Sequence, residues 1–532
     1  MESCKSKFFR IFENNKKQLA FCIIVTFVWG MVTHAYMFFG SYFSHDSIVE
    51  FNADLVGTMN KLEAGRIFVP IYRALIRSDI TLPWMIGLLG LVYIGLSLFL
   101  IVKIFNVKSK ILTILFSGVL VTNVTVIATI ATYIQDFDSN MLALLFAVVA
   151  VYIWNKYDKG FLIGFIFAGL SLGFYQSYIS VAITLIMMVL IFELLKSETF
   201  SNVLKKGLKS VVMLLLSGVF YIVCIKVSQI ITNTTLSSGE TNSLTGITSI
   251  SAVQYINNIL QTYVISTYKI IFAFSSYSEI PVAIFRCVII FIAGILLLIN
   301  IYKNKMKIKE TVLLLCIILL MPVGMNVASV LTNCFVHELM FYALWFVYIF
   351  ALLILYNTAH NSNLKIAKYN IVKCSKITVS ILVIILLWSN VQSANTVYLK
   401  KDLENDANLS MFTRIVYDIE NTENYVIGET NVVFVGVPER EIKDIEGFSR
   451  YTDIIGAGNT YVLGAAGRNY YVSYFENILA NPTVIADENT WEKMQNDNIV
   501  KEMPCYPDEG SIQMIDGILV VKLGEPKEQV KI

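Results

Sequence analysis

Histidine, paired cysteine and charge are what this 532-residue sequence has least of. Its four histidines form no His-Glu-x-x-His motif, which argues against a zinc protease of that class. Its eight cysteines stand singly, without Cys-x-x-Cys or Cys/His spacing, and give no sign of a metal or redox centre. The net charge of +2 gives no sign of a nucleic-acid partner. Only 15% of the residues are charged, whereas a soluble domain usually carries about a quarter, and this excludes an ordinary soluble protein.

Long apolar runs are abundant instead, and 56% of the residues are hydrophobic. Runs of about 20 residues recur, which is the length needed to cross a ~30 Å hydrocarbon core. They predict an all-α polytopic membrane protein. The polar hinge at 175–178 is short, so 160–195 is either two spans or one kinked run. Counting it as two gives eleven candidate spans, at about 19–41, 83–105, 110–132, 139–155, 160–176, 178–195, 208–232, 280–302, 310–331, 338–356 and 376–393.

The basic residues predict how the chain is oriented. With a cytoplasmic N-terminus, the inner segments carry 22 Lys or Arg and the outer loops carry 5. The positive-inside rule favours this orientation. Joining 160–195 into one span would put the basic 196–209 loop outside, which favours eleven spans. The first apolar run is too long for a signal-peptide core and lacks a small-x-small cleavage site, so we expect a retained anchor in the inner (plasma) membrane.

The transmembrane domain is predicted to cover residues 1–398, with two large outer loops at 42–82 and 233–279. Each loop contains an amphipathic stretch typical of an interfacial helix, from Ile48 to Leu62 in the first and from Val253 to Phe274 in the second. These loops are either substrate lids or simple connections.

The composition becomes that of a soluble protein after about residue 399. A helix-like segment at 408–421 and strand-like runs at 431–437 and 517–523 predict a small α/β domain over 399–532. The odd number of spans places this domain outside the membrane.

Three acidic residues stand in the first outer loop, where the chain leaves the first span. If 46–55 is helical, Asp46, Glu50 and Asp54 are spaced i, i+4 and i+8 and share one face. A carboxylate beside the membrane is partly desolvated, which raises its pKa toward that of a general base. Asp46 lies closest to the span and is the leading candidate. The alternative is the solvated polar face of an interfacial helix.

An acidic turn, Gln135-Asp136-Phe137-Asp138, follows the third span. Its two carboxylates could bind a divalent cation or position an acceptor hydroxyl. Alternatively, the turn only caps the fourth helix, with Asp138 as the N-cap residue. The sequence leaves both readings open.

Arginines supply most of the positive charge on the outer side. Arg66, between Gly65 and Phe68, is a candidate phosphate ligand because a guanidinium group offers a bidentate fork. For Arg73 and Arg77 we expect side chains that reach lipid headgroups.

Two further groups lie at outer ends of predicted spans. Tyr175, Gln176 and Tyr178 are one group, although aromatic residues at an interface usually belong to the aromatic belt. His337 and Glu338 open the tenth span, and an ionisable pair there is costly enough to suggest a position facing a site. The candidate substrate-binding residues are therefore Glu50, Arg66, Tyr175, Gln176, His337 and Glu338.

Several short motifs occur in a recognisable order along nearly the whole chain. They are Ser44-His45-Asp46-Ser47, Gly65-Arg66-Ile67-Phe68-Val69-Pro70, Gln135-Asp136-Phe137-Asp138, Met141-Leu142-Ala143-Leu144, Phe174-Tyr175-Gln176-Ser177-Tyr178 and a tail from Met503-Pro504-Cys505 to Asp516-Gly517-Ile518. In this order the chain resembles the bacterial glucosyltransferase family of Gtr type II. Phe68 departs from the pattern, since tryptophan is expected more often at this position.

The resemblance implies a GT-C-type membrane glycosyltransferase that moves glucose from a polyprenyl-phosphate donor to a cell-surface polysaccharide such as O-antigen. It implies that Asp46 is the general base, that Asp136 and Asp138 position the acceptor or hold a metal, and that Arg66 binds the donor phosphate. The expected partners are the lipid-linked donor, the glycan acceptor, the bilayer, and a donor synthase and flippase upstream. Whether a divalent cation takes part stays open.

Two other functions fit the same architecture. A polysaccharide polymerase or ligase would share the outer acids and the membrane spans, and the acceptor alone would distinguish it. A flippase or transporter would show buried charges near mid-span and internal repeats. The spans here are nearly free of charge, with Lys226 and Arg286 as the main exceptions, and no repeat is visible. An enzyme is therefore favoured over a transporter.

Overall fold

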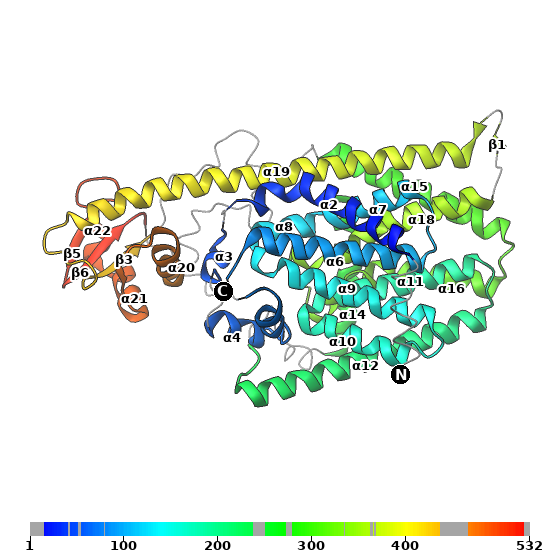
Figure 1. The fold of residues 1–532 in the computed structure, drawn as a ribbon, viewed down its shortest axis with the longest axis horizontal. Coiled ribbons are helices and arrows are strands. Elements are labelled where there is room, and N and C mark those ends of the chain that lie inside the picture. The colour runs from blue at the N-terminus through cyan, green and yellow to red at the C-terminus, as the bar shows by residue number, and fades with distance from the viewer. Residues whose placement is uncertain are drawn as a thin grey trace.

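The computed structural model describes residues 15–525, apart from 41–42, 52–54, 79, 238–250, 273–278, 335, 362–364, 367–368 and 437–466. The side chains of some residues at helix ends, among them His45 and Asp46, also lie outside the described part. Long helices that run in roughly the same direction form a bundle, and a small domain lies beyond one end of it (Figure 1).

Apolar helices build the bundle. Within the described residues, eight helices are long and apolar enough to cross a membrane, and two shorter apolar helices accompany them. This confirms a mostly helical protein with several candidate membrane spans, while the count of eleven spans stays a prediction. The helices of the bundle are α2 (Lys16–Phe38), α6 (Pro83–Ile104), α7 (Lys110–Thr122), α8 (Val124–Thr132), α9 (Phe137–Lys156), α10 (Phe161–Phe174), α11 (Ile179–Leu195), α12 (Phe200–Thr232), α15 (Glu279–Lys303), α16 (Ile308–Gly324), α18 (Phe346–Asn361) and α19 (Ile371–Glu420).

The third predicted span is broken at Asn123 into α7 and α8. The Asn123 side chain accepts a hydrogen bond from the Val126 amide and donates to the carbonyls of Val119 and Leu120. One side chain therefore satisfies backbone groups on both sides of the break, as a capping residue does. After α8 the chain forms a 3₁₀ turn, η2 (Ile134–Asp136), and enters α9, which places the predicted acidic turn at the end of the bundle.

The segment predicted as the first outer loop, which keeps that name below, contains four short helices in its described residues rather than one amphipathic helix. They are α3 (His45–Val49), α4 (Leu55–Glu63), α5 (Val69–Tyr72) and the π-helical η1 (Arg73–Arg77). The predicted amphipathic helix from Ile48 to Leu62 is interrupted, and the condition that 46–55 is helical is not met, because α3 ends at Val49. Beyond this end, the hydroxyl and the amide of Thr81 donate to the carbonyls of Glu50 and Phe51, where a continuing helix would have its own i+4 amides as donors. Asp54 lies outside the described residues.

The amphipathic stretch of the second outer loop is confirmed as helix α14 (Ala252–Phe272). Its buried face is polar: Thr262 donates to the Ser329 hydroxyl and Asn258 to the Val330 carbonyl, both on α17 (Val327–Leu331). Its apolar side chains, such as Leu260 and Val264, are exposed. This polarity suits a helix whose outer face contacts lipid, and a role as a substrate lid stays a prediction.

Helix α19 has 50 residues and is therefore about 75 Å long. It lies along the whole bundle and continues into the C-terminal domain (Figure 1). The predicted span at 376–393 and the predicted helix at 408–421 are thus parts of one helix. Phe412, near its end, contacts the rings of Phe434 and Tyr474, so the helix contributes to the core of the small domain.

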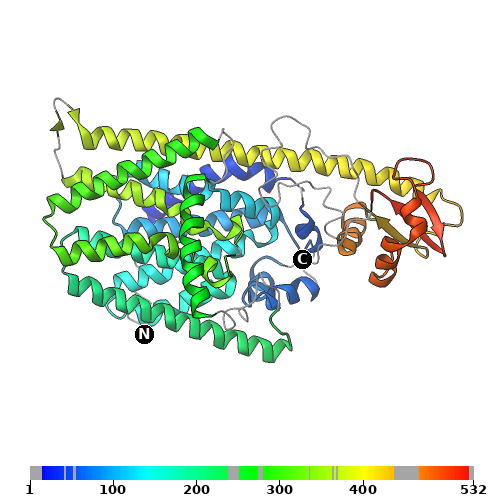
Figure 2. The ribbon, with the colours of Figure 1, turned by 180° about the vertical axis from the view of Figure 1, so that it is seen from behind.

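In its described residues, the C-terminal domain holds a four-stranded sheet in the order β4-β3-β6-β5. The central strand β3 (Asn431–Val435) is parallel to β4 (Val484–Ile485) and β6 (Ile518–Lys522), and β5 (Ile512–Ile515) is antiparallel to β6. This confirms the two predicted strands. Helix α20 (Gly467–Tyr474) of this domain packs against α3 of the first outer loop, and the two lie side by side in both ribbon views (Figures 1 and 2).

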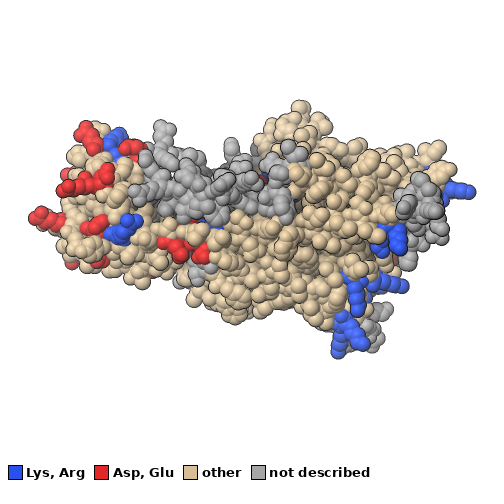
Figure 3. Space-filling model, turned by 90° about the horizontal axis from the view of Figure 1, so that it is seen from above, with Lys and Arg blue, Asp and Glu red and all other residues tan. Residues whose placement is uncertain are grey.

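Charged side chains gather at the two ends of the molecule on the face shown in Figure 3. Acidic side chains predominate over the C-terminal domain and basic side chains at the opposite end. The described surface between the ends carries little charge, as expected for a surface in contact with a lipid bilayer.

Candidate active site

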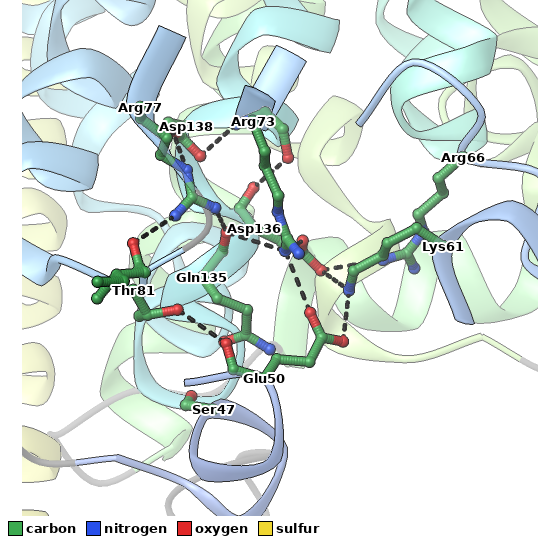
Figure 4. Close-up of polar contacts among 12 residues, drawn as sticks. Ser47, Glu50, Lys61, Arg66, Arg73, Arg77, Thr81, Gln135, Asp136 and Asp138 are labelled. Atoms are coloured by element: carbon green, nitrogen blue, oxygen red, sulfur yellow. Dashed lines mark hydrogen bonds and ion pairs between the residues drawn. The ribbon is translucent and has the colours of Figure 1, made fainter. Parts of the chain in front are cut away.

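Seven charged side chains meet where the first outer loop covers the end of the bundle (Figure 4). We call this group the ionic cluster. Its acids are Glu50 after α3, Asp136 in η2 and Asp138 at the start of α9, and its cations are Lys61 on α4, Arg66 before α5, and Arg73 and Arg77 on η1.

Asp136 is the centre of the ionic cluster. Its Oδ2 accepts from Lys61 Nζ at 2.6 Å and from Arg66 Nη1 at 3.2 Å, and its Oδ1 accepts from Arg73 Nη2 at 2.8 Å. The Asp136 side chain is only 1% exposed. A carboxylate so deeply buried is stable as an ion only when it is paired, and three cations fulfil that need.

Glu50 is a second acceptor for two of the same cations. Lys61 Nζ lies 2.8 Å from its Oε1 and Arg73 Nη2 lies 3.1 Å from its Oε2. Burial alone lowers the pKa of Arg73, but Asp136 and Glu50 outweigh it and raise that pKa above its usual value. Arg73 therefore stays charged and links the first outer loop to the acidic turn.

Asp138 has a separate set of partners. Arg77 Nε lies 3.0 Å from its Oδ2, the Tyr72 hydroxyl donates to the same oxygen at 3.0 Å, and the Ser139 amide donates to its Oδ1 at 2.8 Å. Burial lowers the pKa of Arg77, and Asp138 offsets this effect only in part. Arg77 also donates to the Gln135 carbonyl, so it fixes the main chain of the turn as well as one of its acids.

Arg66 is the most exposed cation of the ionic cluster, with 20% of its side chain accessible, against 3% for Arg73. Its guanidinium carbon lies 4.5 Å from the centre of the Tyr175 ring, which is cation–π geometry. Burial alone lowers the pKa of Arg66, but Tyr175 and Asp136 raise it above its usual value. The guanidinium group is thus charged, held from two sides and still accessible.

The turn before Arg66 is held by two side chains from the bundle. Gly65 has a φ of +72°, a conformation that favours glycine, and a Cβ there would lie 2.7 Å from the Tyr221 hydroxyl. That hydroxyl donates to the Gly65 carbonyl at 2.9 Å, and Gln176 Nε2 donates to the Ala64 carbonyl at 2.9 Å. In this arrangement Gln176 supports the Arg66 turn.

Helix α3, which carries Asp46, is attached beside the ionic cluster. The Ser47 hydroxyl donates to the Thr132 carbonyl at 2.9 Å, and the Ser44 hydroxyl donates to the same carbonyl. Thr132 ends α8, four residues before Asp136. The backbone of Asp46 therefore lies close to the acidic turn, while its side chain is outside the described part of the structure.

Of the two remaining predicted residues, His337 and Glu338, only Glu338 lies in a described ion pair, which is separate from the ionic cluster. Glu338 accepts from Lys269 Nζ at 2.9 Å, and its backbone carbonyl accepts from Thr125. His337 is exposed. Among the described contacts, none joins the Lys269–Glu338 pair to the acids of the ionic cluster.

The expectation that Arg73 and Arg77 reach lipid headgroups is wrong, since both are buried and paired with acids. Sequence reasoning also missed Lys61 as a site residue. For the arginines a signal was present: Arg66, Arg73 and Arg77 are spaced by seven and four residues, a spacing that predicts three side chains on the same side of the loop.

A divalent cation does not fit the acidic turn as it is arranged. The carboxylates of Asp136 and Asp138 are occupied by Lys61 and three arginines. No group of three or more His, Cys, Asp or Glu side chains that could hold a metal occurs among the described residues. The ionic cluster holds four cations against three acids, so it carries one more positive side chain than negative ones.

Comparison with known proteins identifies the family. A family model described as glucosyl transferase GtrII matches residues 35–355, a segment that contains the whole ionic cluster. No curated protein and no solved structure matches the chain. The family model covers more than half of the sequence, and the chain therefore belongs to the glucosyl transferase GtrII family.

Proposed function

We propose that this membrane protein transfers glucose from a polyprenyl-phosphate donor to a cell-surface polysaccharide at the outer face of the membrane. Membership of the GtrII family supports glucosyl transfer. The observation that carries the choice of donor is the ionic cluster, in which four cations face three acids beside the end of the apolar bundle. A lipid-linked phosphate carries its charge where the apolar part of the membrane ends, which in this proposal is the level of the ionic cluster. The accessible guanidinium of Arg66 offers that phosphate a fork of N–H donors.

In the proposed reaction, Asp46 removes the proton from an acceptor hydroxyl, whose oxygen attacks the anomeric carbon of the donor. The bond between that carbon and the phosphate oxygen breaks, and the bonding electrons leave with the phosphate. The products are the glucosylated acceptor and polyprenyl phosphate. Arg66 stabilises the charge that develops on the leaving oxygen, which is electrostatic stabilisation by a preorganised cation.

The contacts of Asp136 and Asp138 favour a supporting role over direct contact with the acceptor. Each carboxylate is fully engaged in holding cations of the first outer loop. With the loop fixed in this way, Arg66 and the backbone of Asp46 are held on the same end of the bundle. We therefore assign the base to Asp46 and the positioning of the loop to the two acids of the turn.

The orientation belongs to the same proposal. The basic end of the molecule in Figure 3 would face the cytoplasm, and the C-terminal domain would lie outside an inner (plasma) membrane. The donor would then reach the ionic cluster from the outer leaflet, where a synthase and a flippase must have delivered it.

The test is transfer by the purified protein in proteoliposomes. Polyprenyl-phosphate glucose carrying a radiolabel is supplied with a lipid-linked surface glycan, and nucleotide-activated glucose serves as the control donor. The expected product is glycan with one additional glucose per acceptor unit, formed from the lipid donor alone. Transfer of glucose from the nucleotide-activated control donor to the glycan would reject the proposal. Joining of glycan chains without added glucose would favour a polymerase or ligase.

A further inference from the structure

Gln135 is the one member of the acidic turn whose side chain has no partner in the described structure. The side chain is 0% exposed, and neither its Oε1 nor its Nε2 forms a hydrogen bond. Its backbone carbonyl, by contrast, accepts from Arg73 at 3.3 Å and also from Arg77. The main chain is fixed by two arginines while the carboxamide points to the side of the site where Glu50 and Ser47 lie (Figure 4).

An unpaired carboxamide in this position is costly. A buried polar group without a partner has lost its hydrogen bonds to water and gained none in return, and most buried side-chain polar atoms are hydrogen-bonded for that reason. Gln176 shows the usual arrangement nearby: its Nε2 donates to the Ala64 carbonyl at 2.9 Å and to the Tyr221 hydroxyl at 2.8 Å. Both polar atoms of the Gln135 carboxamide are therefore available to a ligand.

We propose that the Gln135 carboxamide binds two adjacent hydroxyls of a pyranose ring, one as acceptor and one as donor. This inference rests on the proposed glycosyl transfer. Two neighbouring hydroxyls offer one oxygen to Nε2–H and one O–H to Oε1, and they satisfy both unpaired atoms at once. A phosphate would satisfy only Nε2, and a cation would satisfy only Oε1 beside Arg73 and Arg77.

The position of Gln135 suits a sugar at the reacting centre. It directly precedes Asp136, which holds Arg66, and it follows Thr132, to which α3 is attached through Ser47. A sugar bound to Gln135 would lie between the phosphate-binding guanidinium and the helix that carries Asp46. Because the carboxamide is completely covered, entry of the sugar requires a neighbouring segment to move, and α3 is attached there by hydroxyl hydrogen bonds that a small displacement breaks.

The experiment compares kcat/KM for donors that carry glucose or its monodeoxy analogues, with wild-type protein and Gln135→Met. In the wild type, removing a hydroxyl that Gln135 binds is expected to lower kcat/KM by about 10- to 100-fold, because the carboxamide is then left unpaired. In Gln135→Met, which has a similar length and no hydrogen-bonding groups, removing the same hydroxyl is expected to cause no further loss.

Gln176→Met is the matched control, since it also removes a carboxamide. It is expected to lower the melting temperature by releasing the Arg66 turn, and to keep the wild-type discrimination between deoxy donors. If Gln135→Met instead removes the difference in kcat/KM between the normal acceptor and its monodeoxy analogues, the ring that Gln135 binds belongs to the acceptor. In that case, binding of two adjacent hydroxyls by the carboxamide is still supported.

The inference would be overturned if wild type and Gln135→Met show the same loss of kcat/KM for every monodeoxy donor and acceptor. The partner of the Gln135 carboxamide would then be a buried water molecule. This outcome is distinct from failure of the proposed function, in which the wild-type protein would transfer no glucose from any lipid-linked donor.

Discussion

Lys61 Nζ lies 2.6 Å from Asp136 Oδ2, although the two residues are 75 positions apart in the sequence. This pair joins α4 of the first outer loop to the turn between the third and fourth predicted spans. Both side chains are almost fully buried, with 5% and 1% exposed. The arrangement of the outer loop on the bundle therefore depends on ionic contacts as well as on apolar packing.

Asp136→Asn is expected to destabilise the protein. The substitution keeps the size of the side chain but removes the charge that compensates Lys61 and Arg73, which then remain buried with Glu50 as their acidic partner. Breaking a buried ion pair in this way costs about 3–5 kcal/mol. The measurement is the thermal unfolding midpoint of the protein in detergent or nanodiscs.

Asp158→Asn is the matched control for Asp136→Asn. Asp158 also pairs with a lysine, Lys209, at 2.7 Å, but both side chains are exposed. Exposed pairs contribute little because water screens them, so this variant is expected to unfold like the wild type. Equal effects of the two substitutions would contradict the role given to the ionic cluster.

The sequence indicated the components of the ionic cluster better than their contacts. Glu50, Arg66 and Asp136 were candidates because acids and arginines at a membrane boundary are costly and informative. The buried position of Arg73 could not be read from the pattern, because an arginine beside a membrane satisfies its charge equally well with lipid phosphate or with a carboxylate that is distant in the sequence. The carboxylate that decides the matter is Asp136, 63 residues away.

Helix α19 shows a different limit of sequence reasoning. The composition becomes that of a soluble protein after about residue 399, and a domain boundary is predicted there. The helix continues because Ile371–Glu420 contains no proline and no glycine to stop it. The polarity of a segment indicates its environment, whereas helix-breaking residues such as proline and glycine indicate where a helix ends.

Arg66→Gln is expected to raise the KM for the lipid-linked donor by roughly 10- to 100-fold, since a hydrogen bond to a charged group is worth about 1.5–3 kcal/mol. The unfolding midpoint is expected to change little, because Arg66 is the most exposed cation of the cluster. Arg73→Gln is the contrasting variant. Because Arg73 is buried and paired with Asp136, its replacement is expected to lower the unfolding midpoint. Steady-state kinetics at saturating acceptor, together with thermal unfolding, separate the two effects. A normal donor KM for Arg66→Gln would assign the phosphate to another cation.

Asp46→Asn is expected to abolish glucose transfer while the protein remains inserted and folded. Loss of a general base typically lowers the rate by about 10²- to 10⁴-fold. The hydrogen bonds that attach α3 come from Ser44 and Ser47, so they survive the substitution. The readout is transfer in proteoliposomes together with the unfolding midpoint. Near-normal transfer would reject Asp46 as the base.

A register change in α19 tests whether the C-terminal domain supports the active site. Two alanines inserted after Asp406 keep the helix continuous but rotate everything beyond them by about 200° and shift it by about 3 Å. Phe412 fixes the domain to the end of α19, so the domain moves with the helix and α20 leaves α3.

The insertion in α19 is expected to lower kcat by about 10²-fold, because displacement of a catalytic group by an ångström or more is sufficient for such a loss. The control places two alanines after Glu509, in an exposed turn of the same domain, where the register of α19 is unchanged. That variant is expected to transfer glucose like the wild type. The two variants are compared by transfer in proteoliposomes and by crosslinking between cysteines introduced in α3 and α20. If the insertion after Asp406 removes the crosslink but leaves kcat unchanged, α3 keeps its catalytic position without α20, and the C-terminal domain has another role.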